Sequence, residues 1–142
     1  MPCAKSNRLT SGFANPTYLI TLAFVALVLA WVIPAAFRAR DRRQNLRALA
    51  DLRGALSRYE ADTRTKGPAS LSDLTAGGKY LVTIPEALLS GFHRSSSRIH
   101  EMGVTDDTGG WSYSNWPGDA RQGQVWINCT HTDAHGKPWN AY

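Results

Sequence analysis

The feature that most constrains this chain is an uncharged run over residues 17–37, which reads TYLITLAFVALVLAWVIPAAF. A helix needs about 20 apolar residues to cross the hydrocarbon core of a bilayer. A cleavable secretory signal has a shorter apolar region that ends at a small-residue cleavage site, whereas this run continues through Phe37. The run therefore predicts a transmembrane anchor. Pro34 predicts a kink near its end, because proline removes a backbone donor and crowds the preceding turn.

A second periodic pattern follows the apolar run. Its members recur at steps of three and four residues, which indicates one apolar stripe on a helix: Leu46, Leu49, Leu52, Leu56 and Tyr59. Lys66-Gly67-Pro68 is a stop signal for such a helix. We expect a single long helix, half in lipid and half amphipathic. The alternative is a pair of helices broken at Pro34.

The remaining residues, 67–142, predict a small globular part. Ser70 is a suitable cap for a short helical turn over residues 70–74. Residues 111–113 and 124–128 are typical of short strands, and the turn-forming residues 115–119 between them favour an antiparallel hairpin. Residues 80–84 are predicted to be extended, and residues 91–102 to form a loop. The fold class is α+β, with a long N-terminal helix packed on a small antiparallel sheet.

Charge and cysteine content limit the classes of function. The formal net charge is +5 and the sequence pI is about 9.6. Basic residues cluster directly after the apolar run, where phosphate-rich lipid headgroups would lie: Arg38, Arg40, Arg42, Arg43 and Arg47. No nucleic-acid-binding motif is present, so we expect no nucleic-acid partner. Cys3 and Cys129 form neither a disulfide framework nor a CxxC metal motif.

The N-terminal segment has a recognisable organisation. A short basic leader ends at Gly12, Phe13 follows, and the apolar helix begins soon after. This arrangement resembles the class III signal of type IV pilins and type II secretion pseudopilins. The resemblance implies that a membrane-embedded prepilin peptidase cuts after Gly12 and methylates Phe13. Pro34 also falls at the spacing from Phe13 that these families show.

The resemblance extends into the second half of the chain. Residues 68–74 (PASLSDL), 79–81 and 84–85 look like the segment that joins helix to sheet in pseudopilin-like chains. Residues 108–111 and 133–142 look like their terminal sheet. The chain then divides into a leader (residues 1–12), a transmembrane half of the long helix (13–37), an amphipathic half (38–66) and a head (67–142).

These families imply a structural role without catalysis. The helix would hold the subunit in the inner membrane, with the head outside the cytoplasm, until an assembly platform extracts it. Copies would then join a periplasmic or surface filament through residues 13–37, among which the resemblance singles out Phe13, Thr17 and Pro34. Most members carry a glutamate where this chain has Thr17, which offers a hydroxyl but no charge. This difference favours a minor or tip subunit over a standard major one.

A different class of protein also fits the pattern. An uncleaved single-pass membrane protein could carry a soluble domain that binds a partner or regulates it. More arginines follow the apolar run than precede it, and the positive-inside rule would keep such a domain in the cytoplasm. The N-terminus of the protein separates the two hypotheses, because only the pilin pathway removes the leader.

Several polar and aromatic residues are candidates for binding sites. Calcium prefers hard oxygen ligands, which four aspartates of the head could supply: Asp106, Asp107, Asp119 and Asp133. The alternative is that residues 106–109 form an ordinary turn that binds no metal. His131, Asp133 and His135 form an H-x-D-x-H run, which binds a transition metal or is an ordinary polar loop. Four tryptophans form either a stacking surface or part of the core: Trp111, Trp116, Trp126 and Trp139.

Overall fold

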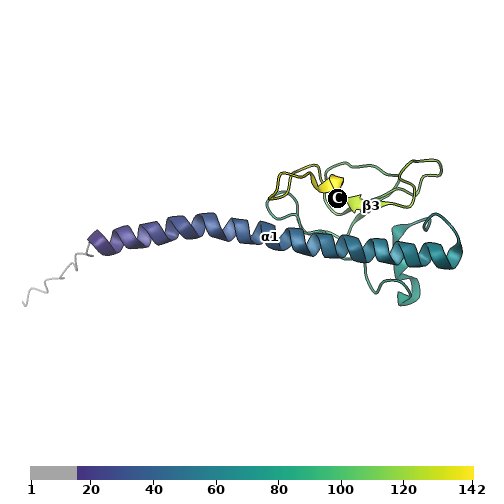
Figure 1. The fold of residues 1–142 in the computed structure, drawn as a ribbon, viewed down its shortest axis with the longest axis horizontal. Coiled ribbons are helices and arrows are strands. Elements are labelled where there is room, and N and C mark those ends of the chain that lie inside the picture. The colour runs from purple at the N-terminus through teal and green to yellow at the C-terminus, as the bar shows by residue number, and fades with distance from the viewer. Residues whose placement is uncertain (1–15) are drawn as a thin grey trace, which may run out of the picture. The chain divides into compact units, whose positions relative to one another are not determined.

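The computed structural model describes residues 16–142, so Gly12 and Phe13 lie outside the described residues. The elements, in chain order, are α1 (Pro16–Thr63), η1 (Leu71–Gly78), β1 (Ile99–His100), β2 (Trp111–Tyr113), β3 (Val125–Ile127) and η2 (Trp139–Ala141) (Figure 1). The chain divides into two compact units, one up to Pro34 and one from Ala35 to Tyr142. Each unit is described by itself below.

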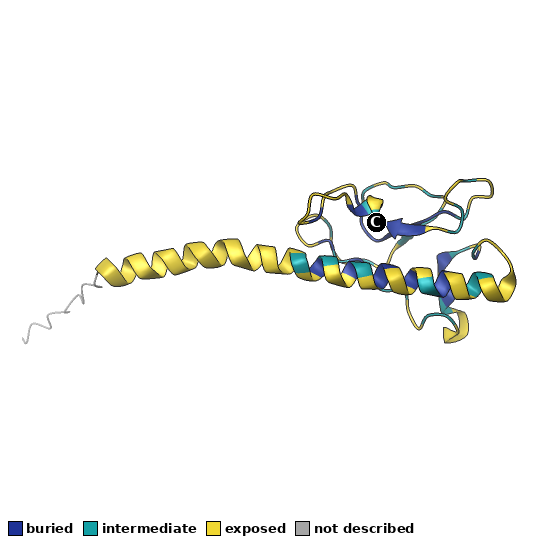
Figure 2. Ribbon diagram, in the orientation of Figure 1, coloured by how far each residue is buried: buried dark blue, intermediate teal, exposed yellow. Residues whose placement is uncertain are grey.

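The described part of the first unit is the beginning of α1. Every residue from 16 to 34 is exposed, including the apolar ones (Figure 2). By length and composition, α1 is able to cross a membrane. The sequence-based prediction of a helix with membrane-spanning character near the N-terminus is therefore confirmed.

The helix α1 runs through Pro34 without interruption and ends at Thr63. Two separate helices broken at Pro34 are therefore not observed. Arg64 follows in the left-handed region, with φ of 57°, and its N–H donates to the Glu60 carbonyl at 2.8 Å. A left-handed residue after the last turn is a common helix ending. The helix stops slightly before the predicted signal at residues 66–68.

The second half of α1 carries a buried stripe. Leu49, Leu52 and Leu56 are buried as predicted, while Leu46 and Tyr59 are half-buried. The stripe also contains residues that the leucine pattern does not reveal: Asp41, Asn45, Ala48 and Ala55. Charged residues on the other faces of this half are exposed, as expected for an amphipathic helix: Arg43, Arg47, Asp51 and Arg58.

The sheet has the strand order β1-β2-β3. Strands β2 and β3 are antiparallel, with Trp111 opposite Ile127, so the predicted hairpin is confirmed. Strand β1 pairs with β2 in parallel, with Ile99 opposite Trp111. The prediction of a wholly antiparallel sheet, and of a loop throughout residues 91–102, was therefore wrong. A strand of two residues is too short to show the alternation that reveals a strand in sequence.

The core joins α1, η1 and the sheet. Leu52, Leu71, Trp111 and Tyr113 are fully buried within one apolar cluster. Each of the two aromatic polar groups has a partner: Trp111 Nε1 donates to the Pro85 carbonyl at 2.7 Å, and the Tyr113 hydroxyl donates to the Pro68 carbonyl at 2.8 Å. The aromatic residues thus tie the sheet to the connection that follows α1.

The connection after α1 has the predicted cap. The Ser70 hydroxyl accepts from the Ser72 N–H at 3.3 Å, and the Asp73 carboxylate accepts from the Ser70 N–H at 3.1 Å. This reciprocal arrangement is a capping box, and it starts η1, whose Leu71 and Leu74 are buried. Gly77 is left-handed and bends the end of η1. Residues 80–84, predicted to be extended, lie outside the three strands.

Candidate functional site

The largest exposed apolar surface in the described chain lies on the first half of α1. Its side chains are between 41% and 77% exposed, with Val28 lowest and Trp31 highest. The large members are Tyr18, Leu19, Ile20, Leu22, Phe24, Val25, Leu27, Val28, Leu29, Trp31, Val32, Ile33 and Phe37. A soluble monomer rarely exposes an apolar patch of this size, so a membrane or another protein is the expected cover.

Two residues singled out by sequence lie on this surface. Thr17 is in the first turn of α1, where its carbonyl accepts a hydrogen bond from the Thr21 hydroxyl at 2.6 Å. Pro34 lies inside the helix and contributes no N–H to the helical ladder. The other two, Gly12 and Phe13, precede the described residues, so the cleavage and methylation expected there stay predictions.

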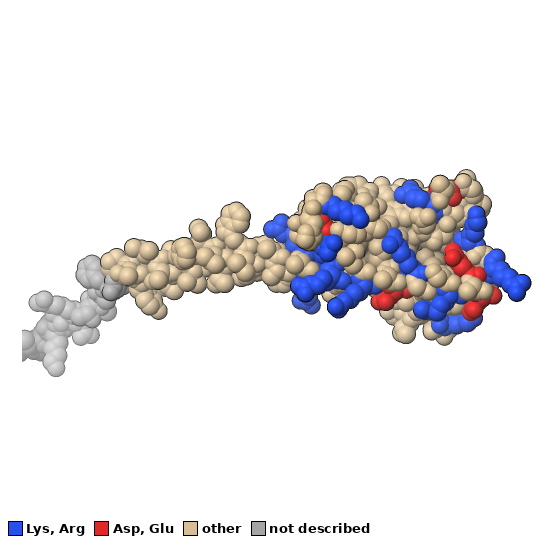
Figure 3. Space-filling view, viewed as in Figure 1, with Lys and Arg blue, Asp and Glu red and all other residues tan. Residues whose placement is uncertain are grey.

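Basic side chains follow on the next turns of α1. Arg38, Arg40, Arg43 and Arg47 are exposed (Figure 3). Arg40, Arg43 and Arg47 line one shallow hollow together with Gln44. Arginines at this position suit a surface of lipid phosphates, because the guanidinium group is permanently charged and donates in pairs.

Polar side chains of α1 hold the loop of residues 88–90. Asn45 is fully buried; its amide donates to the Leu88 carbonyl at 2.6 Å, and its Oδ1 accepts from the Leu88 N–H at 2.7 Å. Asp41 accepts from the Ser90 N–H at 3.1 Å. These part-buried bonds give partners to backbone groups of the loop. The polar residues within the buried stripe are therefore structural.

Asp133 is the buried centre of a network at the C-terminus. Its side chain is 0% exposed and accepts from Arg42 Nε at 2.8 Å and from the Tyr142 hydroxyl. The N–H groups of His135 and Lys137 also donate to it. Burial opposes ionisation, but these donors outweigh burial and hold the pKa of the Asp133 carboxyl well below its ordinary value. Asp133 therefore connects Tyr142 to Arg42 of α1.

Two further candidate calcium ligands have local partners. Asp106 accepts from Asn128 Nδ2 at 2.6 Å and from the Thr108 hydroxyl at 2.8 Å, and these bonds lower the pKa of its carboxyl to about 2. Asp119 accepts from the Ser114 hydroxyl and from the Arg121 N–H. Within residues 16–142, neither carboxylate joins a group of three or more metal-binding side chains. The four aspartates are therefore not gathered into one cluster.

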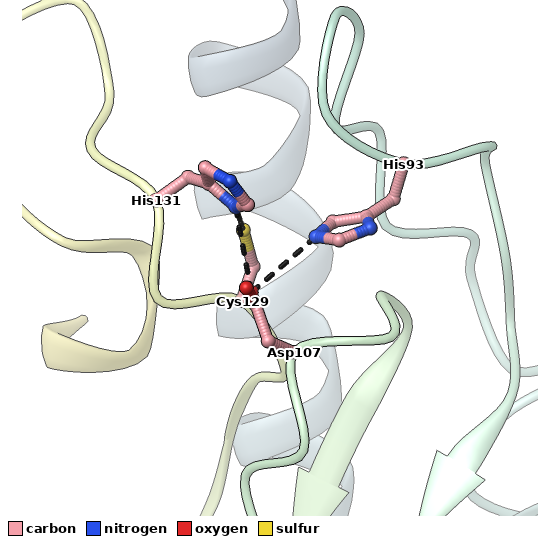
Figure 4. A group of neighbouring side chains, drawn as sticks. All are labelled: His93, Asp107, Cys129 and His131. Atoms are coloured by element: carbon pink, nitrogen blue, oxygen red, sulfur yellow. Dashed lines mark hydrogen bonds and ion pairs between the residues drawn. The ribbon is translucent and has the colours of Figure 1, made fainter.

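Asp107 belongs to a different group, which the sequence did not reveal. It lies with His93, Cys129 and His131, and the ligand atoms of all four residues are within 4.8 Å of one another (Figure 4). His131 is the only member shared with the H-x-D-x-H run; Asp133 and His135 are not in the group. No spacing motif predicts this set, because three separate connections of the head supply it.

Cys129 and the tryptophans are mostly core residues. Cys129 is 0% exposed, and burial raises the pKa of its thiol to about 11. Trp111, Trp126 and Trp139 are buried, whereas Trp116 is 55% exposed. Three of the four tryptophans are thus unavailable as a stacking surface, in agreement with the alternative that they form part of the core.

Comparisons with protein-family models, with curated proteins and with solved structures gave no match. The functional argument therefore rests on the sequence and geometry of this chain.

Proposed function

We propose that this chain is a structural subunit of a filament of the type IV pilus or type II secretion pseudopilus kind, and that it has no catalytic role. The observation that carries the proposal is the division of α1. Its first half is apolar and exposed throughout, whereas its second half buries one stripe in the head. An anchor that extends as a helix into the core of its own extracellular head is the organisation these subunits require.

In this role, the exposed half of α1 is buried first by lipid and later by other subunits. Lipid covers it while the subunit waits in the inner membrane, since each buried Å² of apolar surface is worth about 25 cal/mol. Neighbouring helices replace lipid in the filament core. Repeating one heterologous contact, with a rotation that does not close, then yields a helical filament of identical or related subunits.

Maturation would begin at the leader. Prepilin peptidase would cut after Gly12 and methylate Phe13, and an inner-membrane assembly platform would then lift the subunit into the filament. Thr17 and Pro34 would belong to the assembly surface together with Phe13. Because Thr17 lacks the carboxylate that neutralises a neighbour's terminal amine in these families, we assign the chain to a minor or tip position.

The basic residues after the apolar run fit the same arrangement. Arg38, Arg40, Arg43 and Arg47 would lie at the headgroup layer while the subunit is in the membrane. The head would face the periplasm or the cell exterior. In the filament, the heads would form the outer wall around the packed helices.

The deciding experiment is intact-mass and N-terminal analysis of the full chain from native membranes, with and without the peptidase. We expect a chain that begins at methylated Phe13 when the peptidase is present, and a chain that retains the leader when it is absent. Gly12→Val should block processing, and Ser11→Val is the matched control that should leave it intact. A leader retained in all samples would refute the proposal and support an uncleaved single-pass protein.

A further inference from the structure

Four side chains with metal-binding atoms converge at one end of the sheet (Figure 4). His93 lies in the connection before β1, and Asp107 lies between β1 and β2. Cys129 and His131 come directly after β3. Three segments, far apart in sequence, therefore contribute to one cluster.

Three distances between ligand atoms of this cluster are nearly equal. His93 Nε2 lies 3.3 Å from Asp107 Oδ1, and His131 Nδ1 lies 3.4 Å from the same oxygen. His131 Nδ1 is 3.5 Å from Cys129 Sγ. Zinc bonds of about 2.0 Å to nitrogen or oxygen and about 2.3 Å to sulfur give tetrahedral edges of about 3.3 Å and about 3.5 Å. These three separations match such edges, and all four ligand atoms lie within 4.8 Å of one another.

Hydrogen bonding alone accounts poorly for the same separations. The two nitrogen-to-oxygen distances exceed about 3.2 Å, the upper end of the usual range for N–H donors and oxygen acceptors. His131 Nδ1 also faces two groups, Asp107 Oδ1 and Cys129 Sγ, although a ring nitrogen has one proton or one lone pair. A cation among the four atoms would use every lone pair that points inward.

We propose that His93, Asp107, Cys129 and His131 form a tetrahedral site for Zn²⁺ or a similar divalent transition metal. Imidazole and thiolate are ligands of zinc, whereas calcium takes oxygen ligands only. Four protein ligands complete a tetrahedron, which is the arrangement of structural rather than catalytic zinc sites. Cys129 Sγ releases its proton to solvent as it binds the ion.

The surroundings of the ligands suit this role. The Thr130 N–H donates to Asp107 Oδ1 at 2.7 Å, which orients the carboxylate and leaves a second lone pair for the ion. The Phe92 ring stacks on the His131 ring, with centroids 4.4 Å apart, and this contact restrains the imidazole. Ligand orientation by neighbouring groups is a general feature of metal sites.

Exposure falls from the mouth of the site to its base. The His131 side chain is 42% exposed, Asp107 is 33% exposed and His93 is 16% exposed. Cys129 is fully buried. An ion can therefore enter from solvent past His131 and bind the sulfur at the base.

Bound metal would fasten three connections of the head to one another. The strands have only two or three residues each, so little of the head is held by the sheet ladder. Small domains with modest cores commonly depend on a metal or disulfide for additional stability. This inference concerns the head alone and does not depend on the proposed filament role.

The test uses the full chain in detergent, with Cys3→Ser so that Cys129 is the only thiol. The protein is stripped with a chelator, and Zn²⁺ is titrated calorimetrically. Co²⁺ is added to a second sample as a spectroscopic probe. We expect equimolar Zn²⁺ binding, the intense visible bands of tetrahedral Co²⁺, and a thiolate-to-cobalt charge-transfer band. A chain that takes up neither ion, or binds Co²⁺ without the thiolate band, overturns the proposal.

Substitutions identify the ligands. His131→Gln changes an exposed side chain and should preserve the fold while weakening Zn²⁺ binding by more than about 100-fold, the upper limit for losing a group that only orients a ligand. Cys129→Ser should remove the charge-transfer band. His100→Gln is the matched control, because His100 pairs with Asp106 at 3.2 Å outside the cluster. Equal weakening by His100→Gln and His131→Gln would overturn the assignment.

Discussion

The side chain of Asn45 forms two hydrogen bonds with the backbone of Leu88, one to its N–H at 2.7 Å and one to its C=O at 2.6 Å. Asn45 is fully buried on α1, and Leu88 lies far along the chain in the connection before β1. The side-chain amide of Asn45 thereby bonds both backbone groups of Leu88, as a neighbouring strand would do in a sheet. This pair fixes how the loop of residues 88–90 lies on the second half of α1.

Replacing Asn45 with leucine should destabilise the head strongly. The apolar side chain is of similar size but leaves the part-buried N–H and C=O of Leu88 without these partners. We expect a loss of about 2–4 kcal/mol in the free energy of unfolding, since each buried unsatisfied group costs about 1–3 kcal/mol. Urea unfolding followed by tryptophan fluorescence measures this loss. Gln44→Leu, at an exposed neighbouring position, is the control and should change the stability little.

The network of Asp133 should make the head sensitive to acid. The pKa of this carboxyl is lowered in the folded state: burial opposes the shift, but donors that include Tyr142 and Arg42 outweigh it. A lowered pKa contributes stability above the unfolded value of about 3.9, and that contribution is lost as the pH falls through the folded pKa. The Tm of the natural protein should therefore decrease once the pH is lowered below about 4.

Asp133→Asn removes this titration. The variant should have a Tm at least about 4 °C lower at neutral pH, the shift expected for a loss of about 1 kcal/mol in a small domain. Its Tm should depend less on pH in the acid range. Asp51→Asn, at an exposed position of α1, provides the comparison. Parallel Tm curves for Asp133→Asn and the natural protein between about pH 4 and pH 2 would contradict the prediction.

Alanine substitutions at Gly67 and Gly118 distinguish the effect of backbone strain from that of steric overlap. Gly67 has φ of 89°, and an added Cβ would overlap the Tyr113 hydroxyl oxygen. Gly118 has a similar φ of 91° with open space around it. Both substitutions by alanine incur the left-handed penalty, but only Gly67→Ala displaces the hydroxyl that donates to Pro68.

We therefore expect Gly67→Ala to destabilise the head by about 1–3 kcal/mol more than Gly118→Ala, which is the usual cost of overpacking. Differential scanning calorimetry of both variants measures the difference. Equal losses would mean that strain at positive φ dominates and that the Tyr113 hydroxyl moves without cost.

Sequence reasoning succeeded where a pattern was long or chemically specific. The stripe that contains Leu49, Leu52 and Leu56 repeats over several turns, so it predicted the buried face of α1. The cap at Ser70 and the hairpin of β2 and β3 carry local signals that require no knowledge of tertiary contacts.

The misses depended on long-range contacts. Asn45 interrupts the apolar stripe, and its role is visible only with Leu88 beside it. Strand β1 has two residues, so its parallel pairing leaves no periodicity in the sequence. The cluster around Cys129 joins three connections, whereas the compact H-x-D-x-H run suggested a site from neighbouring residues alone. Spatial proximity set by the fold, not spacing along the chain, defines this cluster.

The first half of α1 provides the test of membrane association. Leu22 and Leu29 lie seven residues apart and therefore share a helix face, and each is about half exposed. Replacing both with arginine makes insertion less favourable by about 6 kcal/mol, since each arginine near the centre of a span costs about 3 kcal/mol. We expect most of the full chain to leave the membrane fraction on alkaline carbonate extraction.

The matched control adds the same charge to the same helix beyond the apolar run. Gln44 and Ala50 are exposed on the second half of α1, so Gln44→Arg with Ala50→Arg places two arginines outside the proposed span. This variant should stay in the membrane fraction, because lipid does not cover those positions and anionic headgroups attract the added charge. Extraction of both double variants to the same extent would show that net charge, rather than burial of the apolar half in lipid, governs the association.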